Sequence, residues 1–304
     1  MEYVMKTQSL SKRYKKFTAL DNLSMNVPKG SIYGFVGKNG AGKTTLIRII
    51  TGLQPQSEGE FEVFGAKDST KDIYQSRRRM GAIVETPSIH LDCTAEENML
   101  SMYRIMGIPK DNRVNEILTL VGLGDVGKKK AKNFSLGMKQ RLAIAMALCN
   151  DPDFLILDEP INGLDPQGIV EIRELILKLN HEKHITVLIS SHILDELSRL
   201  ATHYGFIDRG RLIREMSAEE LEAECNKCLS LTVSDINTLT AYLEQTGAYY
   251  KITGDNSANI YSDIRINALV TALDKKGCEV LHISEKEESL ESFFINLIGG
   301  EGNE

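Results

Sequence analysis

The sequence predicts an α/β protein in which a mixed sheet carries a helical insert and is followed by a small α+β domain. Three observations lead to this prediction. Short apolar runs alternate with helical patterns through residues 1–228, as in sheets with crossover helices. A glycine-rich loop stands between an early apolar run and a helical pattern. Residues 229–304 carry 5 Lys and Arg against 12 Asp and Glu, a balance of −7, whereas residues 1–228 carry 31 against 30.

The bulk composition is that of an ordinary globular protein. The 304 residues are 42% apolar and 26% charged, and no run approaches the ~18–20 apolar residues that a membrane span requires. The N-terminus has no apolar signal region, so we expect a cytoplasmic location and any membrane role to need a partner chain. Nucleic-acid binding needs a concentrated basic face, which the short, scattered basic clusters do not supply, so no nucleic-acid partner is expected.

Five cysteines are scattered along the chain, a pattern typical of reduced thiols in a cytosol. Cys225 and Cys228 have the spacing of a metal-ligand pair, but no second Cys or His pair lies at a useful distance. Coincidence is therefore the preferred interpretation of this pair.

The elements of the first part follow from the spacing of apolar residues. Residues 1–65 predict mostly short strands, at Tyr3–Leu10, Leu23–Val27, Ser31–Val36 and Glu60–Val63. Apolar residues then recur every three or four positions, which predicts helices at Ala95–Ile105, Asp111–Val121 and Leu136–Cys149. Two later apolar runs predict buried parallel strands, at Phe154–Leu157 and Thr186–Ser190. We therefore expect a mixed sheet with a helical subdomain at about 93–150, all within a nucleotide-binding domain of residues 1–228.

The last part of the chain has a pattern of its own. The strands expected there are Leu229–Val233, Tyr249–Thr253, Asn259–Ser262 and Cys278–Ile283, with a hairpin between the second and the third. The helices expected are Ile236–Gln245, Ile264–Lys275 and Ser289–Leu297. This order predicts a C-terminal accessory α+β domain of ferredoxin-like type over residues 229–304.

A glycine loop predicts a phosphate site after the Ser31–Val36 strand. It has the spacing G-x4-G-K-[ST] and continues into an apolar helix pattern, which is the context that this motif requires. Lys43 supplies a point charge to the β- and γ-phosphates, and the Thr44 hydroxyl can ligate Mg²⁺. The alternative is a glycine-rich turn that binds no ligand. Lys43 and Thr44, which stand at the Lys and Ser/Thr positions of the motif, argue against it. The predicted nucleotide-binding residues are Gly37, Lys38, Asn39, Gly40, Ala41, Gly42, Lys43, Thr44 and Thr45.

A second Ser/Gly loop, at Phe134–Arg141, opens a predicted helix. Helix N-termini bind anions because their first N–H groups are free and the helix dipole favours negative charge. Two such N-termini in one chain indicate a protein that closes two copies around each nucleotide. In the second loop, the hydroxyl of Ser135 and the backbone N–H of Gly137 are the groups expected to face phosphate.

Two acids and a histidine end the later apolar runs. Asp158 can hold Mg²⁺ directly or through water, and Glu159 is placed to accept a hydrogen bond from an attacking water as general base. The two acids could instead cap the next helix, an interpretation that Lys43 weighs against. His192 leaves a strand at the carboxyl end of the sheet, from which it can reach a γ-phosphate; a satisfied surface histidine is the alternative.

Taken together, residues 3–225 resemble the ATP-binding subunit of the ATP-binding-cassette (ABC) transporters, which have a P-loop NTPase fold. By this resemblance Gly37–Thr45 is the Walker A loop, and Asp158 and Glu159 are the Walker B aspartate and the catalytic glutamate. The resemblance implies further nucleotide contacts: Tyr14 stacks on adenine, Ser135 and Gly137 form a signature loop for the opposite subunit's nucleotide, Asp165 belongs to the D-loop, and His192 is the switch histidine.

Two departures from the family's usual motifs indicate which subgroup of these transporters the chain resembles. The usual signature is Leu-Ser-Gly-Gly-Gln, and three of its five residues are replaced here, at Phe134, Leu136 and Met138. Glu85 stands where the family usually has a Gln that touches Mg²⁺ and the lytic water. We expect Glu85 in the active site, where its carboxylate could ligate Mg²⁺ more strongly than an amide but, when ionised, cannot donate a hydrogen bond. A solvated glutamate in a misaligned loop is the alternative. Both departures resemble the bacitracin and lantibiotic exporters, and in this family the Glu85 loop also meets the membrane subunit.

The resemblance implies an ATPase that binds ATP and Mg²⁺ and works as a homodimer with separate integral membrane permease subunits. Its expected place is the inner face of the bacterial cell membrane, as a peripheral protein, and its expected cargo is a peptide antibiotic such as bacitracin or a lantibiotic. A soluble ABC ATPase without a transport role is the alternative, although such proteins usually carry two cassettes or a distinctive insertion. A small-molecule P-loop kinase would lack the signature loop and His192.

Overall fold

The computed structural model describes residues 2–109, 113–224, 227–262, 264–287 and 290–299. The chain divides into two compact units, Met1–Ala218 and Glu219–Glu304. The predicted assignment of residues 1–228 and 229–304 to a nucleotide-binding and an accessory role stays a prediction. Three positions used in the sequence analysis, Asp111, Cys225 and Ser289, lie outside the described residues.

The first unit is built on a six-stranded sheet with the order β11-β10-β4-β9-β8-β7. Its strands are β4 (Ile32–Val36), β7 (Met80–Ile83), β8 (Phe154–Asp158), β9 (Thr186–Ser191), β10 (His203–Asp208) and β11 (Arg211–Ser217). All neighbours pair in parallel except β10 and β11. Every residue of β4, β8 and β9 is buried, because a parallel sheet covered on both faces needs apolar side chains on both.

A second, antiparallel sheet has the order β2-β1-β5-β6, with β3 paired to β1. Its strands are β1 (Tyr3–Tyr14), β2 (Phe17–Leu23), β3 (Asn26–Pro28), β5 (Glu58–Val63) and β6 (Ala66–Lys67). The single strand expected at Leu23–Val27 is wrong, because two strands meet there. Pairing with β1 is interrupted at Ser24, whose Oγ accepts a hydrogen bond from the backbone N–H of Ser9 at 2.9 Å. This side-chain bond competes with regular strand pairing.

The core of the first unit joins the two sheets around helix α1 (Lys43–Ile50). One buried cluster contains residues of α1 together with residues of β1, β2, β4, β5 and β8. Leu46, Ile47 and Ile50 belong to it, and each is at most 1% exposed. The start of α1 is thereby fixed against the carboxyl end of β4, which is where the glycine loop lies.

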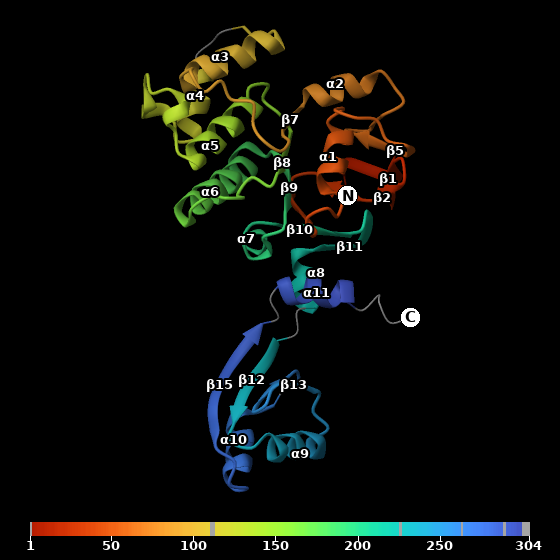
Figure 1. Ribbon diagram of the computed structural model, residues 1–304, viewed down its shortest axis with the longest axis vertical. Coiled ribbons are helices and arrows are strands. Elements are labelled where there is room, and N and C mark those ends of the chain that lie inside the picture. Colours follow the sequence, from red (N-terminus) through yellow and green to blue (C-terminus); the bar gives the residue numbers. More distant parts are fainter. Residues whose placement is uncertain (1, 110–112, 225–226, 263, 288–289, 300–304) are drawn as a thin grey trace. The chain divides into compact units, whose positions relative to one another are not determined.

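Helices α3 to α5 form the expected insert between β7 and β8 and stand together on one side of the unit (Figure 1). Helix α3 begins with a capping box, in which the side chains of Thr94 and Glu97 each accept a bond from the other residue's backbone N–H. Besides α1, the α-helices described in this unit are α2 (Asp72–Arg78), α3 (Ala95–Met106), α4 (Arg113–Leu120), α5 (Leu136–Ala147), α6 (Pro166–Lys183) and α7 (Leu194–Ser198). No helix among the residues that the structure describes has both the length and the apolar character needed to cross a bilayer.

The second unit contains an antiparallel sheet of order β13-β14-β12-β15, the order of a split β-α-β fold. Its elements are α8 (Ala218–Glu224), β12 (Lys227–Val233), α9 (Ile236–Thr246), β13 (Tyr250–Gly254), β14 (Ser257–Ile260), α10 (Ile266–Asp274), β15 (Val280–Glu287) and α11 (Leu290–Gly299). Leu231 of the sheet and Leu239 and Leu269 of the helices are fully buried in one cluster. This unit therefore has a core of its own.

Candidate functional site

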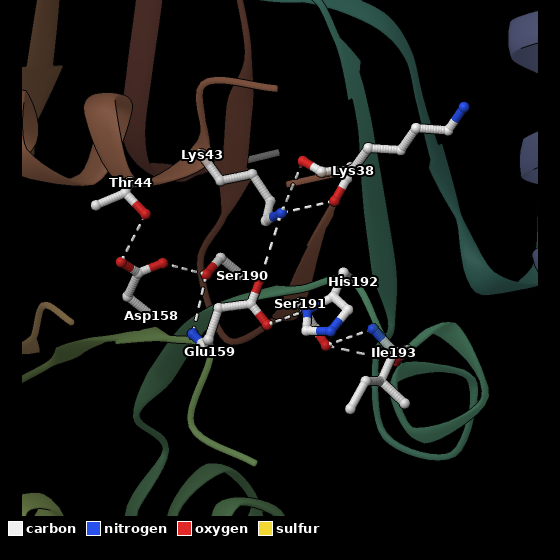
Figure 2. Close-up of polar contacts among 10 residues, drawn as sticks. Lys38, Lys43, Thr44, Asp158, Glu159, Ser190, Ser191, His192 and Ile193 are labelled. Atoms are coloured by element: carbon white, nitrogen blue, oxygen red, sulfur yellow. Dashed lines mark hydrogen bonds and ion pairs between the residues drawn. The ribbon is translucent and has the colours of Figure 1, made fainter. Parts of the chain in front are cut away.

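The candidate site lies where three neighbouring parallel strands end. The glycine loop follows β4, Glu159 follows β8 and His192 follows β9. Since β9 lies between β4 and β8 in the sheet, the three chain segments emerge side by side at one edge. Figure 2 shows their polar side chains converging there. Ligands of open α/β sheets characteristically bind outside the carboxyl ends of the strands.

Lys43 is the first residue of α1 and is only 5% exposed. Its ammonium group donates hydrogen bonds to the backbone oxygens of Gly37, at 2.6 Å, and Lys38, at 3.3 Å. It also forms an ion pair with the carboxylate of Glu159 at 3.3 Å. A buried charge is tolerated only when it is paired and hydrogen-bonded. The loop therefore holds this cation at the mouth of the site, facing the acid that follows β8.

Two glycines fix the path of the loop. A Cβ at Gly37 would stand 2.6 Å from both the side chain and the backbone oxygen of Ile207. Gly42 has φ +114, and a Cβ there would lie 2.6 Å from the backbone oxygen of Ala19. Gly42 is also the N-cap of α1 and supplies no side-chain acceptor to the first turn. The N–H groups of that turn are consequently the kind that an anion can satisfy.

The side chains of Thr44 and Asp158 bring together two oxygen atoms that can ligate a metal ion. The Thr44 hydroxyl donates to the Asp158 carboxylate at 2.9 Å, although the residues are 114 positions apart. Hard oxygen ligands suit Mg²⁺, which in nucleotide sites takes one or two carboxylates together with phosphate oxygens. The donor chemistry of this pair fits that ion. Among the described ranges, no three His, Cys, Asp or Glu side chains gather as a metal site.

Glu159 and His192 form a contact of their own. The Nδ1 atom of His192 lies 2.7 Å from the Glu159 carboxylate. Glu159 has φ 50, a left-handed conformation that is uncommon outside glycine and is kept only when its surroundings impose it. Here its backbone N–H donates to both the carbonyl and the Oγ of Ser190, each at 3.1 Å. The carboxylate is thereby held between Lys43 and His192 (Figure 2).

Ser190 is a site residue that the sequence analysis did not assign. Its hydroxyl donates a short hydrogen bond to Asp158 and accepts the bond from the Glu159 N–H. The two strands put Ser190 directly opposite Asp158 in register. A small polar residue at the end of an apolar strand is the only signal that sequence offers, and it acquires meaning only once β8 and β9 are known to be neighbours.

Glu85 follows β7 and also has a left-handed backbone, with φ 58. Its carboxylate accepts a hydrogen bond at 2.6 Å from Arg48 of α1. This bond raises the pKa of the Arg48 guanidinium above its ordinary value. Arg48 is a second residue that sequence reasoning did not assign. The predicted role of Glu85 beside Mg²⁺ stays a prediction, and the structure adds a cationic partner for it.

Tyr14 ends β1 and is 41% exposed. Its hydroxyl donates to the side chain of Gln54 at 2.6 Å, and the Gln54 amide donates to the backbone oxygen of Thr45 at 3.2 Å. The aromatic ring predicted to stack on adenine is therefore tied through Gln54 to the helix that carries the glycine loop. Gln54 is a further residue of the site that the sequence analysis missed.

The signature loop and the D-loop lie at the starts of two other helices. Ser135 is the N-cap of α5, and its Oγ accepts a bond from the Met138 N–H at 3.2 Å. Asp165 is the N-cap of α6 and accepts from the Gly168 N–H at 3.1 Å. A Cβ at Gly163 would lie 3.5 Å from Leu136, so the two loops pack closely. Their hydrogen bonds stay within their own helices, and those that the structure gives do not join them to Lys43.

Two hollows lie outside the strand edge that carries these groups. One, of about 700 Å³, lies between α4, the end of α5 and the end of α6, and its lining includes none of the predicted site residues. The other, of about 460 Å³, is here called the insert groove and runs between the end of α1, the chain after β7, α3 and α5. Residues that define it are Leu53, Val84, Thr86, Pro87, Ile105 and Met146. Leu53 and Ile105 are 66% and 79% exposed, which leaves an apolar rim open to solvent.

Comparison with known proteins gives consistent results. Residues 20–162 match the family described as ABC transporter. The bacitracin transport ATP-binding protein BcrA of Bacillus licheniformis is 43% identical over 99% of both chains. The lantibiotic transport ATP-binding protein SrtF of Streptococcus pyogenes is 44% identical over 70% of this chain and 90% of the relative. The dimeric, post-hydrolysis ATP-binding cassette MJ0796 with ADP and Pi is similar in structure, with a TM-score of 0.63, 28% identity, and coverage of 70% of this chain and 98% of that one.

Proposed function

The chain belongs to the ABC transporter family, as a member that binds and hydrolyses ATP, and from this premise we propose that it powers a peptide-antibiotic exporter. The observation that carries the proposal is the likeness to the bacitracin transport protein over 99% of both chains, second unit included. The membrane subunits are separate chains. The cargo is bacitracin, a lantibiotic or a peptide antibiotic of that kind.

The residues at the strand edge have different roles in binding and hydrolysing ATP. Lys43 leaves the carbonyls of its own loop for the β- and γ-phosphates of ATP. Glu159, released from Lys43, accepts a hydrogen bond from the attacking water as general base. His192 keeps the Glu159 carboxylate oriented and reaches the γ-phosphate. Tyr14 stacks on the adenine ring, and the remaining residues of Gly37–Thr45 enclose the phosphates.

Thr44 and Asp158 hold Mg²⁺, and Glu85 is a further oxygen donor for it. Bound there, the ion would supply positive charge that offsets the negative charge developing during phosphoryl transfer. Ser190 fixes the Asp158 carboxylate, so that the metal ligand and the general base are both anchored to the end of β9.

The working form is a homodimer with two nucleotides between its subunits. Each ATP lies between Lys43 and Thr44 of one copy and Ser135 and Gly137 of the other, with Asp165 at the interface. The place of Ser135 at the start of α5, the packing of Gly163 against Leu136 and the dimeric state of the MJ0796 cassette support this arrangement. ATP binding closes the dimer because the γ-phosphate satisfies both anion sites, and hydrolysis removes that bridge.

The membrane permease docks in the insert groove. The apolar rim at Leu53 and Ile105 supports this assignment, because an exposed apolar surface of this kind marks an interaction site. The protein accordingly works at the inner face of the bacterial membrane. A soluble ABC ATPase without transport is not favoured, since the similar full-length protein is a transport protein by name. Co-purification with a polytopic membrane protein separates the two possibilities.

The test of the catalytic assignment is Glu159→Gln. The variant keeps the shape of the side chain and removes its basicity, so it is expected to bind ATP, to accumulate as an ATP-bound dimer and to hydrolyse roughly 100-fold more slowly or less. Gel filtration with ATP and a phosphate-release assay measure both effects. Glu60→Gln is the matched control, because Glu60 is an exposed carboxylate paired with Lys67. Hydrolysis by Glu159→Gln at the parental rate would show that the general base is another group.

A further inference from the structure

Arg48 and Glu85 connect the metal-binding helix to the chain after β7. Arg48 lies four residues after Thr44 on α1, so the two side chains share one face of the helix. The guanidinium donates to the Glu85 carboxylate at 2.6 Å, across 37 residues of sequence. The two side chains are 38% and 56% exposed, so neither is locked in by burial.

The same pair adjoins the insert groove. Val84 and Thr86, on either side of Glu85, both line the groove, and so does Leu53, just beyond the end of α1. Glu85, which has a left-handed backbone, therefore stands between two residues that line the groove.

The Glu85 carboxylate can bind either a guanidinium or a metal ion, so Arg48 competes with the metal ion for it. A glutamine at position 85 would not attract Arg48 in this way. Glutamine is neutral and can form no ion pair with Arg48. The 2.6 Å hydrogen bond shows that the guanidinium is the partner of the carboxylate in this structure. The competition is thus a consequence of having glutamate at position 85.

We propose that Arg48 is a positioning residue that holds the Glu85 carboxylate on α1 until Mg²⁺·ATP is bound, whereupon Glu85 exchanges Arg48 for the metal. The inference rests on the proposed role of Glu85 as a metal donor. It deepens that role, because it names the residue that competes with the metal for the carboxylate.

The experiment is a Mn²⁺ titration followed by electron paramagnetic resonance, with a non-hydrolysable ATP analogue, so that no turnover enters the readout. Arg48→Met removes the competing cation and keeps the aliphatic length, and it is expected to tighten Mn²⁺ binding roughly two- to fivefold. Arg48→Lys keeps a cation and is expected to restore most of the parental affinity. Arg79→Met is the matched control, since Arg79 forms an ion pair of similar length with Asp153 at the other end of β7.

The background of Glu85→Gln supplies the decisive comparison. Exchange requires Glu85, so Arg48→Met is expected to change Mn²⁺ affinity less in that background than in the parent. An equal tightening in both backgrounds would mean simple charge repulsion and would overturn the inference, as would unchanged or weaker binding by Arg48→Met alone. If Glu85→Ala, which removes the ligand oxygens at this position, leaves Mn²⁺ affinity unchanged, the exchange is also refuted. The ATPase assignment is tested separately by Glu159→Gln and survives either result.

Discussion

Replacing Ser190 by alanine tests whether one hydroxyl aligns both acids of the site. Ser190 is fully buried, and its Oγ bonds Asp158 on one side and the Glu159 N–H on the other. Alanine removes both bonds and leaves the Asp158 carboxylate, 3% exposed, with the Thr44 hydroxyl as its remaining described partner. The Glu159 N–H keeps its bond to the Ser190 carbonyl. Asp158 is therefore expected to lose its fixed orientation more than Glu159.

The magnitude follows from the kind of bond that is lost. A hydrogen bond to a charged group contributes about 1.5–3 kcal/mol to stability. If the whole of that free energy is lost from the transition state, the ATPase rate falls roughly 10- to 150-fold, since 1.4 kcal/mol corresponds to about a factor of ten. The unfolding free energy is expected to fall by about the same 1.5–3 kcal/mol, which corresponds to roughly 3–12 °C in Tm for a unit of this size.

Ser191→Ala is the control that separates catalysis from stability. Ser191 is the next residue of β9, equally buried, but its Oγ accepts a bond from the backbone N–H of Ile193 at 2.9 Å. The Ser191→Ala substitution should lower the unfolding free energy by about 0.5–1.5 kcal/mol. Phosphate release and Mn²⁺ affinity should fall in Ser190→Ala and remain near the parental values in Ser191→Ala. Equal losses of activity in the two variants would refute the claim that Ser190 acts through Asp158.

Two other predictions concern the groove and a buried thiol. Ile105→Lys places a charge on the apolar rim of the insert groove and is expected to release the protein from membranes that contain its permease, as measured by co-sedimentation. Tyr74→Lys, an equally exposed change on α2, should stay bound. Burial raises the pKa of Cys149 to about 12, so its thiol stays protonated and unreactive at about pH 8.5. Peptide mapping should find iodoacetamide on the half-buried Cys93 well before Cys149, and the reverse order would contradict the burial argument.

Helices and strands were predictable from the sequence where residues close together in the chain determine them. The helices α3, α5 and α9 begin within a residue of their expected starts, because caps and apolar spacing act over one or two turns. The break between β2 and β3 was not predictable in this way. It depends on Ser24 bonding Ser9, a contact between strands whose pairing the apolar pattern does not reveal.

The sequence by itself determined the chemistry of the loops. The spacing of Gly37–Thr45 after a buried strand, and the acids that end β8, predict a nucleotide site because backbone N–H groups, a lysine and a carboxylate act locally. Family membership followed from the same motifs. The bonds that orient the site were decided by the tertiary structure. Ser190 meets Asp158 only because β8 and β9 are neighbours in register, and Arg48 meets Glu85 only because α1 packs beside the end of β7. Such contacts span 32 and 37 residues, and sheet order, which no local pattern encodes, decides which of them form.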